Sequence, residues 1–171
     1  MKTKIIILVG LAVLLAFAGV FWRDALEKLK ADGYMAYTPA EAEALAYTKC
    51  GQCHNTDRIA KYCMRCGPPL IVVVHNMKSL IRLEREKGRH GLESYTDAQA
   101  VAIAQVWNAQ VGNWEDTWRA KDLAKLLEGD KALLKLLDTP VKQRPIEAAL
   151  AGRTAPGAYK EEHTPASQSK P

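Results

Sequence analysis

The sequence predicts an all-α fold, with a three-helix domain between an apolar amino-terminal segment and a carboxy-terminal helical extension. Three observations support this prediction. Thr38-Pro39 and Thr96-Asp97-Ala98-Gln99 are typical helix starts, with a hydroxyl at the N-cap and, in the second, a glutamine three residues later. Leu70 to Lys87 places apolar residues on one helix face. Beyond residue 113, leucines recur at helical spacing as far as Leu137.

Composition limits the size and the partners of this domain. The chain has 171 residues, of which 48% are hydrophobic and 25% charged, enough for one modest core with appendages but not for a large enzyme. The net charge of +5 is spread among acidic residues, and no basic patch is interleaved with aromatic side chains. A nucleic-acid partner is therefore not expected.

The first 23 residues are a signal-anchor or a signal peptide. Lys2 and Lys4 precede an unbroken apolar run from Ile5 to Trp22. A small-residue cleavage site is present at Ala16-Phe17-Ala18, but the length of the run and its terminal tryptophan favour an uncleaved membrane helix. The basic tail should stay inside, so the remaining chain would lie on the periplasmic side of a bacterial inner membrane, or free in the periplasm if cleavage occurs.

The predicted elements follow in order. Residues 24–37 form a linker with an amphipathic helix, and residues 38–112 hold helices over about 38–47, 70–87 and 96–110. Residues 113–150 form the extension, with two short helices broken at Gly129-Asp130 and with Trp114 and Trp118 on one helix face. Residues 151–171 are predicted to be a disordered tail. The extension either packs over the domain or docks on a larger respiratory assembly.

All four cysteines lie in two C-x-x-C pairs, and the first pair is followed by a histidine. Cys50-Gly51-Gln52-Cys53-His54 is the attachment motif for c-type haem, in which two thiols add to the vinyl groups and the histidine ligates the iron. Cys63-Met64-Arg65-Cys66 lacks that histidine, and its two cysteines are expected to form a disulfide in an oxidising compartment. One covalent haem c is therefore predicted.

Zinc is the rival interpretation, because the pairs Cys50/Cys53 and Cys63/Cys66 are separated by nine residues and could give four thiolates to one ion. The chain would then be a zinc-ribbon-like interaction module. The helical surroundings and the predicted export favour haem. A thiol oxidoreductase built on Cys63 and Cys66 is a weaker alternative, because no βαβ setting surrounds the pair.

A sixth iron ligand must come from downstream, where Met64, His75, Met77 and His90 are available. Met77 shares the inward helix face with Val73, Val74 and Leu80, whereas His75 lies about 200° away around the same helix. Met77 is therefore the predicted ligand and His75 the alternative, and an open sixth position would indicate a haem sensor or enzyme. Val73, Val74, Ile103 and Trp107 are expected to bury the macrocycle.

Residues Thr38 to Gln110 resemble the small class I monohaem cytochromes c, with an amino-terminal helix, the motif close behind it, a downstream methionine and a final helix with an aromatic residue. The resemblance implies His54 and Met77 as axial ligands, and a crossing of the first and last helices at Ala42, Ala46 and Ala104 near Trp107. The sequence departs from the pattern in the short interval between His54 and Met77 and in the extra cysteine pair. It implies an electron carrier, not an enzyme, whose partners are redox proteins or a membrane respiratory complex.

Overall fold

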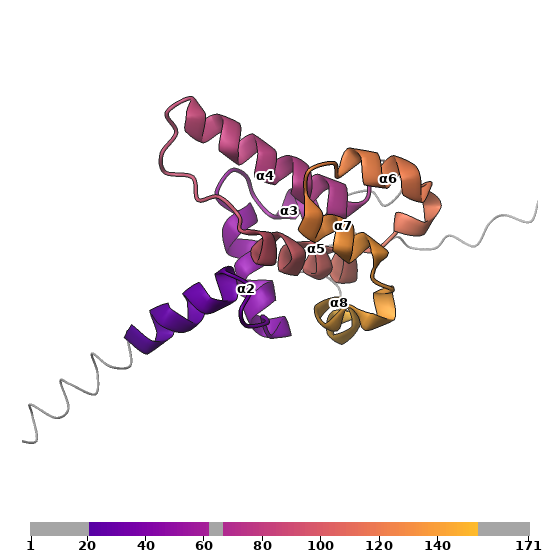
Figure 1. Cartoon of the computed structure of the whole chain (residues 1–171), viewed down its shortest axis with the longest axis horizontal. Coiled ribbons are helices and arrows are strands. Elements are labelled where there is room, and N and C mark those ends of the chain that lie inside the picture. The colour runs from indigo at the N-terminus through magenta and orange to yellow at the C-terminus, as the bar shows by residue number, and fades with distance from the viewer. Residues whose placement is uncertain (1–20, 62–66, 154–171) are drawn as a thin grey trace, which may run out of the picture.

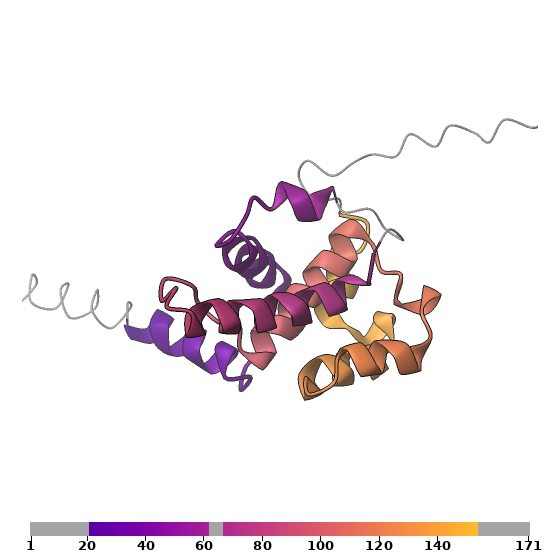
Figure 2. The ribbon, with the colours of Figure 1, turned by 90° about the horizontal axis from the view of Figure 1, so that it is seen from above.

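The computed structural model describes residues 21–61 and 67–153, and every regular element in those ranges is helical (Figures 1 and 2). The all-α prediction is confirmed for this part of the chain. Residues 21–31 form a first helix. The elements after it are α2 (Pro39–Cys50), α3 (Asp57–Ala60), α4 (Leu70–Glu86), α5 (Asp97–Val111), η1 (Glu115–Thr117), α6 (Ala120–Leu126), α7 (Lys131–Asp138), η2 (Val141–Gln143) and α8 (Pro145–Leu150).

Both predicted helix starts are present as reciprocal capping boxes. The Thr38 hydroxyl accepts from the Glu41 backbone N–H while the Glu41 carboxylate accepts from the Thr38 N–H, and Thr96 and Gln99 do the same for α5. Each box satisfies two backbone donors that the first turn of a helix leaves without partners. The starts of α2 and α5 are thus set by local sequence.

Helix α5 lies at the centre of the fold. It packs against α2, α4, α7 and α8 (Figure 1), and nine of its residues are buried. Helix α2 packs against it, and the small residues Ala42 and Ala46 of α2 and Ala104 of α5 are fully buried. The Tyr47 and Trp107 rings lie beside this contact with their centroids 5.0 Å apart. The expected packing of these two helices against each other near Trp107 is therefore observed.

The segment after residue 112 is helical and packs on the central helix through α7 and α8. One detail of the prediction is wrong: Trp114 and Trp118 do not share a helix face. They flank the short η1 turn, where Trp118 has extended backbone, and Trp114 is buried while Trp118 is partly exposed. Trp114 donates from its indole N–H to the Gly67 carbonyl at 3.2 Å, so a long-range contact fixes its place.

The amino-terminal helix, residues 21–31, projects from the body (Figures 1 and 2). Among the residues that the structure describes, no helix is long and apolar enough to cross a membrane. The apolar run predicted to do so falls almost entirely on residues 1–20, outside the described ranges, and so does most of the predicted tail.

Candidate haem site

The cysteine motif lies at an apolar cavity of about 500 Å³ between α4 on one side and the end of α2 with α3 on the other. This volume is within the range of sites for small molecules and cofactors, roughly 300–1,000 Å³. The lining is mostly apolar, with charged groups only at Arg58, Glu84 and Arg89. The cavity is lined by Cys50, Cys53, His54, Arg58, Ile59, Leu70, Val73, Val74, Met77, Leu80, Ile81, Glu84, Arg89, Leu92, Tyr95 and Trp107.

The motif presents its three functional residues to this cavity from one wall. Cys50 is the last residue of α2 and is buried, whereas Cys53 is exposed and His54 is half-buried in the loop that leads to α3. The His54 Nδ1 lies 3.2 Å from the Asn55 carbonyl oxygen. That contact fixes the ring through one nitrogen and leaves the Nε2 atom for another partner.

The buried thiol of Cys50 lies beside two aromatic side chains. The indole N–H of Trp107 donates to the Cys50 Sγ at 3.4 Å. The Tyr95 hydroxyl is also near the thiol, and it lies 3.4 Å from the carbonyl oxygen of the preceding residue, Lys49. Burial raises the pKa of the Cys50 thiol, against hydrogen bonds from Trp107 and Tyr95 that favour the thiolate. Burial also raises the pKa of Tyr95. Both groups are therefore neutral at pH 7.

The motif loop is held by a segment far along the chain. The Gln52 amide accepts from the Glu93 backbone N–H at 2.7 Å and donates to the Lys49 carbonyl at 3.1 Å, while Lys49 and Glu93 form an ion pair. Between the cysteines, a Cβ atom added at Gly51 would lie only 2.8 Å from the Tyr47 carbonyl oxygen. The close turn after α2 thus requires glycine at this position.

The facing wall is a stripe along α4. The apolar residues Leu70, Val73, Val74, Met77, Leu80 and Ile81 line the cavity at three- and four-residue spacing. Met77 is partly buried and packs against the core. The structure therefore brings Cys50, Cys53, His54 and Met77 to one cavity, together with Val73, Val74 and Trp107. Ile103 is fully buried in the core but does not line the cavity.

The two histidines that the sequence offered as other candidate iron ligands lie elsewhere. His75 is on a different face of α4, with its Nδ1 3.4 Å from the Asp130 carboxylate, which also accepts from the Lys78 ammonium at 3.1 Å. These three groups line a separate polar cavity of about 310 Å³. His90 is exposed in the loop after α4 and lines neither cavity. Neither histidine is brought to the cysteine motif.

Met64 and the second pair, Cys63 and Cys66, fall outside the described residues. Their predicted disulfide and the four-cysteine zinc site therefore stay predictions. Within the ranges that the structure does describe, no three side chains among His, Cys, Asp and Glu are grouped as a metal site.

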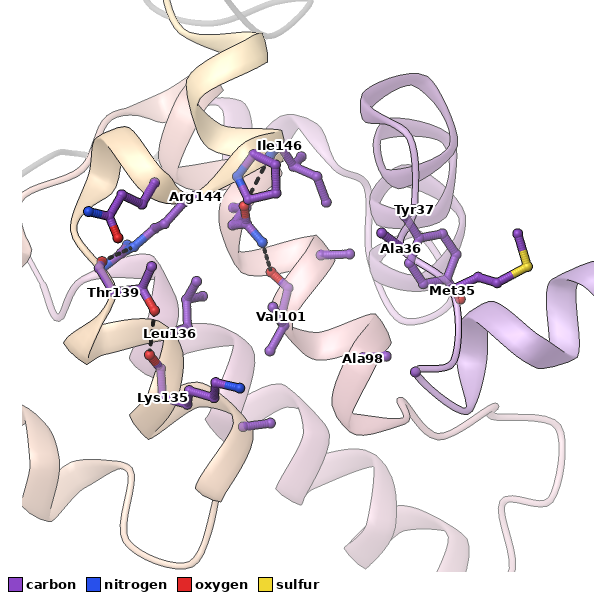
Figure 3. Close-up of a pocket in the computed structure, with 16 residues that line it drawn as sticks. Met35, Ala36, Tyr37, Ala98, Val101, Lys135, Leu136, Thr139, Arg144 and Ile146 are labelled. Carbon is purple, nitrogen blue, oxygen red and sulfur yellow. Dashed lines mark hydrogen bonds between the residues drawn. The ribbon is translucent and has the colours of Figure 1, made fainter.

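A further apolar cavity, of about 370 Å³, is lined from α5 by Ala98, Val101, Ala102 and Gln105 (Figure 3). The linker residues Gly33, Met35, Ala36 and Tyr37 form one of its walls, and α7 with the start of α8 forms another. Two of its polar side chains are bonded within the chain: Arg144 donates to the Thr139 carbonyl at 2.8 Å, and Gln105 to the Val101 carbonyl at 3.3 Å. None of the predicted site residues lies here.

Sequence reasoning missed Tyr95, Arg58 and Arg89 as cavity residues. Tyr95 had a usable signal, because an apolar residue just before a capping box often packs on the fourth helical residue, and both Tyr95 and Ala100 are buried. Arg58 and Arg89 had no such signal in the sequence. They are ordinary exposed cations until the fold places them at the rim.

Comparison with protein families, with curated proteins and with solved structures gives no match for this chain.

Proposed function

We propose that the chain is a membrane-tethered monohaem cytochrome c that transfers single electrons between redox partners on the periplasmic side of a bacterial inner membrane. One observation carries the proposal: the two motif cysteines, the adjacent histidine and Met77 line the same apolar cavity. The apolar run from Ile5 to Trp22 after a lysine-bearing tail supports the tether and the compartment.

The residues present fit a covalently attached haem. The cavity is mostly apolar and lies between a helix stripe and the motif loop, as a flat hydrophobic macrocycle requires. The Cys50 and Cys53 thiols would each add S–H across a vinyl group and so form two thioethers. Arg58 is an exposed cation at the cavity that makes no ion pair with a described residue, so it would pair with a propionate.

Bound haem would supply one-electron iron chemistry, and the side chains of the cavity would set its properties. His54 and Met77 would saturate the iron, leaving no position for a substrate, which is why an electron carrier is proposed in place of an enzyme. A thioether ligand raises the reduction potential relative to a second imidazole. Val73, Val74 and Trp107 would exclude water and disfavour the extra charge of the ferric form.

The ligand assignment is tested by absorption spectra of full-length protein made in a host that matures cytochromes c. The ferric protein is expected to show the weak long-wavelength band of an iron–methionine bond, and Met77→Leu should abolish this band while the covalent haem is retained. Met35→Leu is the matched control, because this methionine lies in the amino-terminal linker. If Met77→Leu leaves the band unchanged, the assignment of Met77 is wrong.

Two further spectra separate the alternatives. His75→Ala should change neither the spectrum nor the potential, because His75 is paired with Asp130 away from the cavity. The ferrous wild-type protein should bind carbon monoxide weakly, since Met77 fills the sixth position. Immediate binding would favour a sensor or enzyme with an open position, and a colourless protein containing one zinc ion would favour the interaction module.

A further inference from the structure

The apolar side chains that the body leaves exposed are concentrated at the amino-terminal helix and the turn after it. Phe21, Trp22 and Tyr34 are exposed at 69%, 67% and 79%, and Leu29 and Met35 at about two fifths. Single exposed apolar residues are normal on a soluble protein. Five within fifteen residues form a patch that calls for a covering surface.

Three apolar residues of this helix share one face. Trp22, Leu26 and Leu29 lie at i, i+4 and i+7, within about 60° of one another around the axis. Lys30 lies about 40° beyond Leu26 and about 100° from Leu29, and it is turned to the body, where it is buried and paired with Glu41. Leu26, on the edge of the face next to the body, is therefore half-buried, whereas Trp22 and Leu29, farther from that edge, stay exposed.

The connection between this helix and the body, residues 30–37, has a well-defined backbone geometry, and we call it the joint. Gly33 has a φ of +82°, its N–H donates to the Lys30 carbonyl, and the Tyr34 N–H donates to the Leu29 carbonyl at 2.9 Å. This is the paired hydrogen bonding of a Schellman helix end. Four residues later, Tyr37 is buried in the core and lies beside α5 (Figure 3).

A lipid bilayer is the surface that fits the patch. The patch begins where the apolar run from Ile5 ends, and it contains a tryptophan and a tyrosine, the residues that favour the membrane–water interface. A helix of this length spans about 16 Å, whereas one interfacial region is only about 5–8 Å deep. Trp22 and Tyr34 can both reach that region only if the helix is inclined toward the membrane plane.

We infer that Leu29, Tyr34 and Met35 form a second membrane contact, which lays helix 21–31 along the bilayer and orients the domain on its surface. The inference rests on the tether in the proposed function. Because the joint is fixed by Gly33, Lys30 and Tyr37, the inclination of the helix also sets the inclination of the cavity that holds the cysteine motif.

Photochemical crosslinking tests this contact in the full-length matured protein, reconstituted in vesicles of phosphatidylethanolamine and phosphatidylglycerol. The photoreactive residue benzoylphenylalanine replaces Trp22, Tyr34, Met35 or, as a control, Leu126. Leu126 matches Met35 in exposure, 44% against 43%, and lies on α6, away from the helix in both views (Figures 1 and 2). Mass spectrometry then identifies what each position has captured.

Lipid adducts at positions 22, 34 and 35, with at least tenfold less at 126, would support the inference. Adducts at 22 alone would overturn it and leave the tether intact, because the helix would then stand upright. Crosslinked dimers of the chain through 34 or 35 would also overturn it and assign the patch to a second copy. If position 22 captures no lipid, the tether fails as well, while the haem spectrum of the same sample reports on the electron-transfer proposal separately.

Discussion

Two regions beside α5 hold charged and polar groups in different conditions. At the cavity that Trp107 lines, Arg58 and Cys53 make no side-chain hydrogen bond or ion pair with another described residue. Beside η1 and α8, Glu115 accepts from the Asn108 amide and is paired with Arg144 at 2.7 Å. Groups that have partners within the chain hold the fold together, and groups placed at an apolar cavity without partners are available to a ligand.

The ion cluster of Arg144, Glu115 and Glu147 is almost completely buried. Each of the three side chains is exposed by a tenth or less, and the guanidinium donates to both carboxylates and to the Thr139 carbonyl. The carboxylates hold the pKa of Arg144 above its ordinary value, even though burial opposes this. The cluster joins η1 and α8, elements that are too short to be stable alone.

The largest loss of stability is expected from a substitution that breaks this ion cluster. Arg144→Met should destabilise the protein by about 3–5 kcal/mol, because Glu115 and Glu147 would be left buried without a cation. Denaturant unfolding measures the loss. Arg153→Met is the control, since its pair with Glu43 is exposed to water and should contribute less than about 1 kcal/mol. Equal effects of the two substitutions would mean that the buried cluster contributes no more to stability than an exposed ion pair does.

A smaller effect compares the two thiols of the cavity in apo-protein, with Cys63 and Cys66 replaced by serine. At pH 7, Cys53 should react with a maleimide about ten times faster than Cys50, because Cys53 is exposed while Cys50 is buried with a raised pKa. The Cys50→Ser and Cys53→Ser variants give each rate alone. The difference should vanish in denaturant, and its absence in native buffer would show that Cys50 is not buried.

The smallest expected effect is the pH dependence of the ion pair between Lys30 and Glu41, which attaches the amino-terminal helix to the body. Lys30 lowers the pKa of Glu41 to about 2, so the carboxylate stabilises the fold fully above its ordinary pKa of about 4.5, and this contribution is lost as pH falls through about 2. Because Glu41 is more than a third exposed, we expect Glu41→Gln to cost only about 1 kcal/mol at pH 6 and less at pH 3. Unfolding at the two pH values measures this.

Glu84→Gln is the control for that experiment, since Glu84 forms ion pairs with Lys87 and Arg89 at the surface and should leave the stability at both pH values unchanged within error. A constant cost of Glu41→Gln at both pH values would mean that the ion pair with Lys30 is not what stabilises the joint.

Local signals predicted the parts of the fold that local interactions determine. The capping residues Thr38 and Thr96 marked the starts of α2 and α5, and the apolar stripe of α4 placed Met77 on the face that lines the cavity. The C-x-x-C-H pattern alone predicted Cys50, Cys53 and His54 as candidate haem-binding residues. In each case the interacting residues lie within a few positions of one another, so the sequence alone contains the pattern.

What the sequence could not predict depends on partners distant in the chain. The motif loop is held by the hydrogen bond between Gln52 and the backbone of Glu93, 41 residues away, and Arg144 meets Glu115 across 29 residues. Trp114 and Trp118 were expected on one helix face because their spacing is helical, but the contact of Trp114 with Gly67 places the two side chains differently. No local pattern records such pairings.

Intact mass spectrometry of the full-length protein, from a host that matures cytochromes c, tests most directly whether the cavity holds haem. We predict one haem per chain that stays attached after denaturation, and its loss when Cys50 and Cys53 are both replaced by serine. The same chain with no haem, and with one zinc ion that denaturation releases, would contradict the cytochrome proposal and assign the four cysteines to a metal-stabilised module.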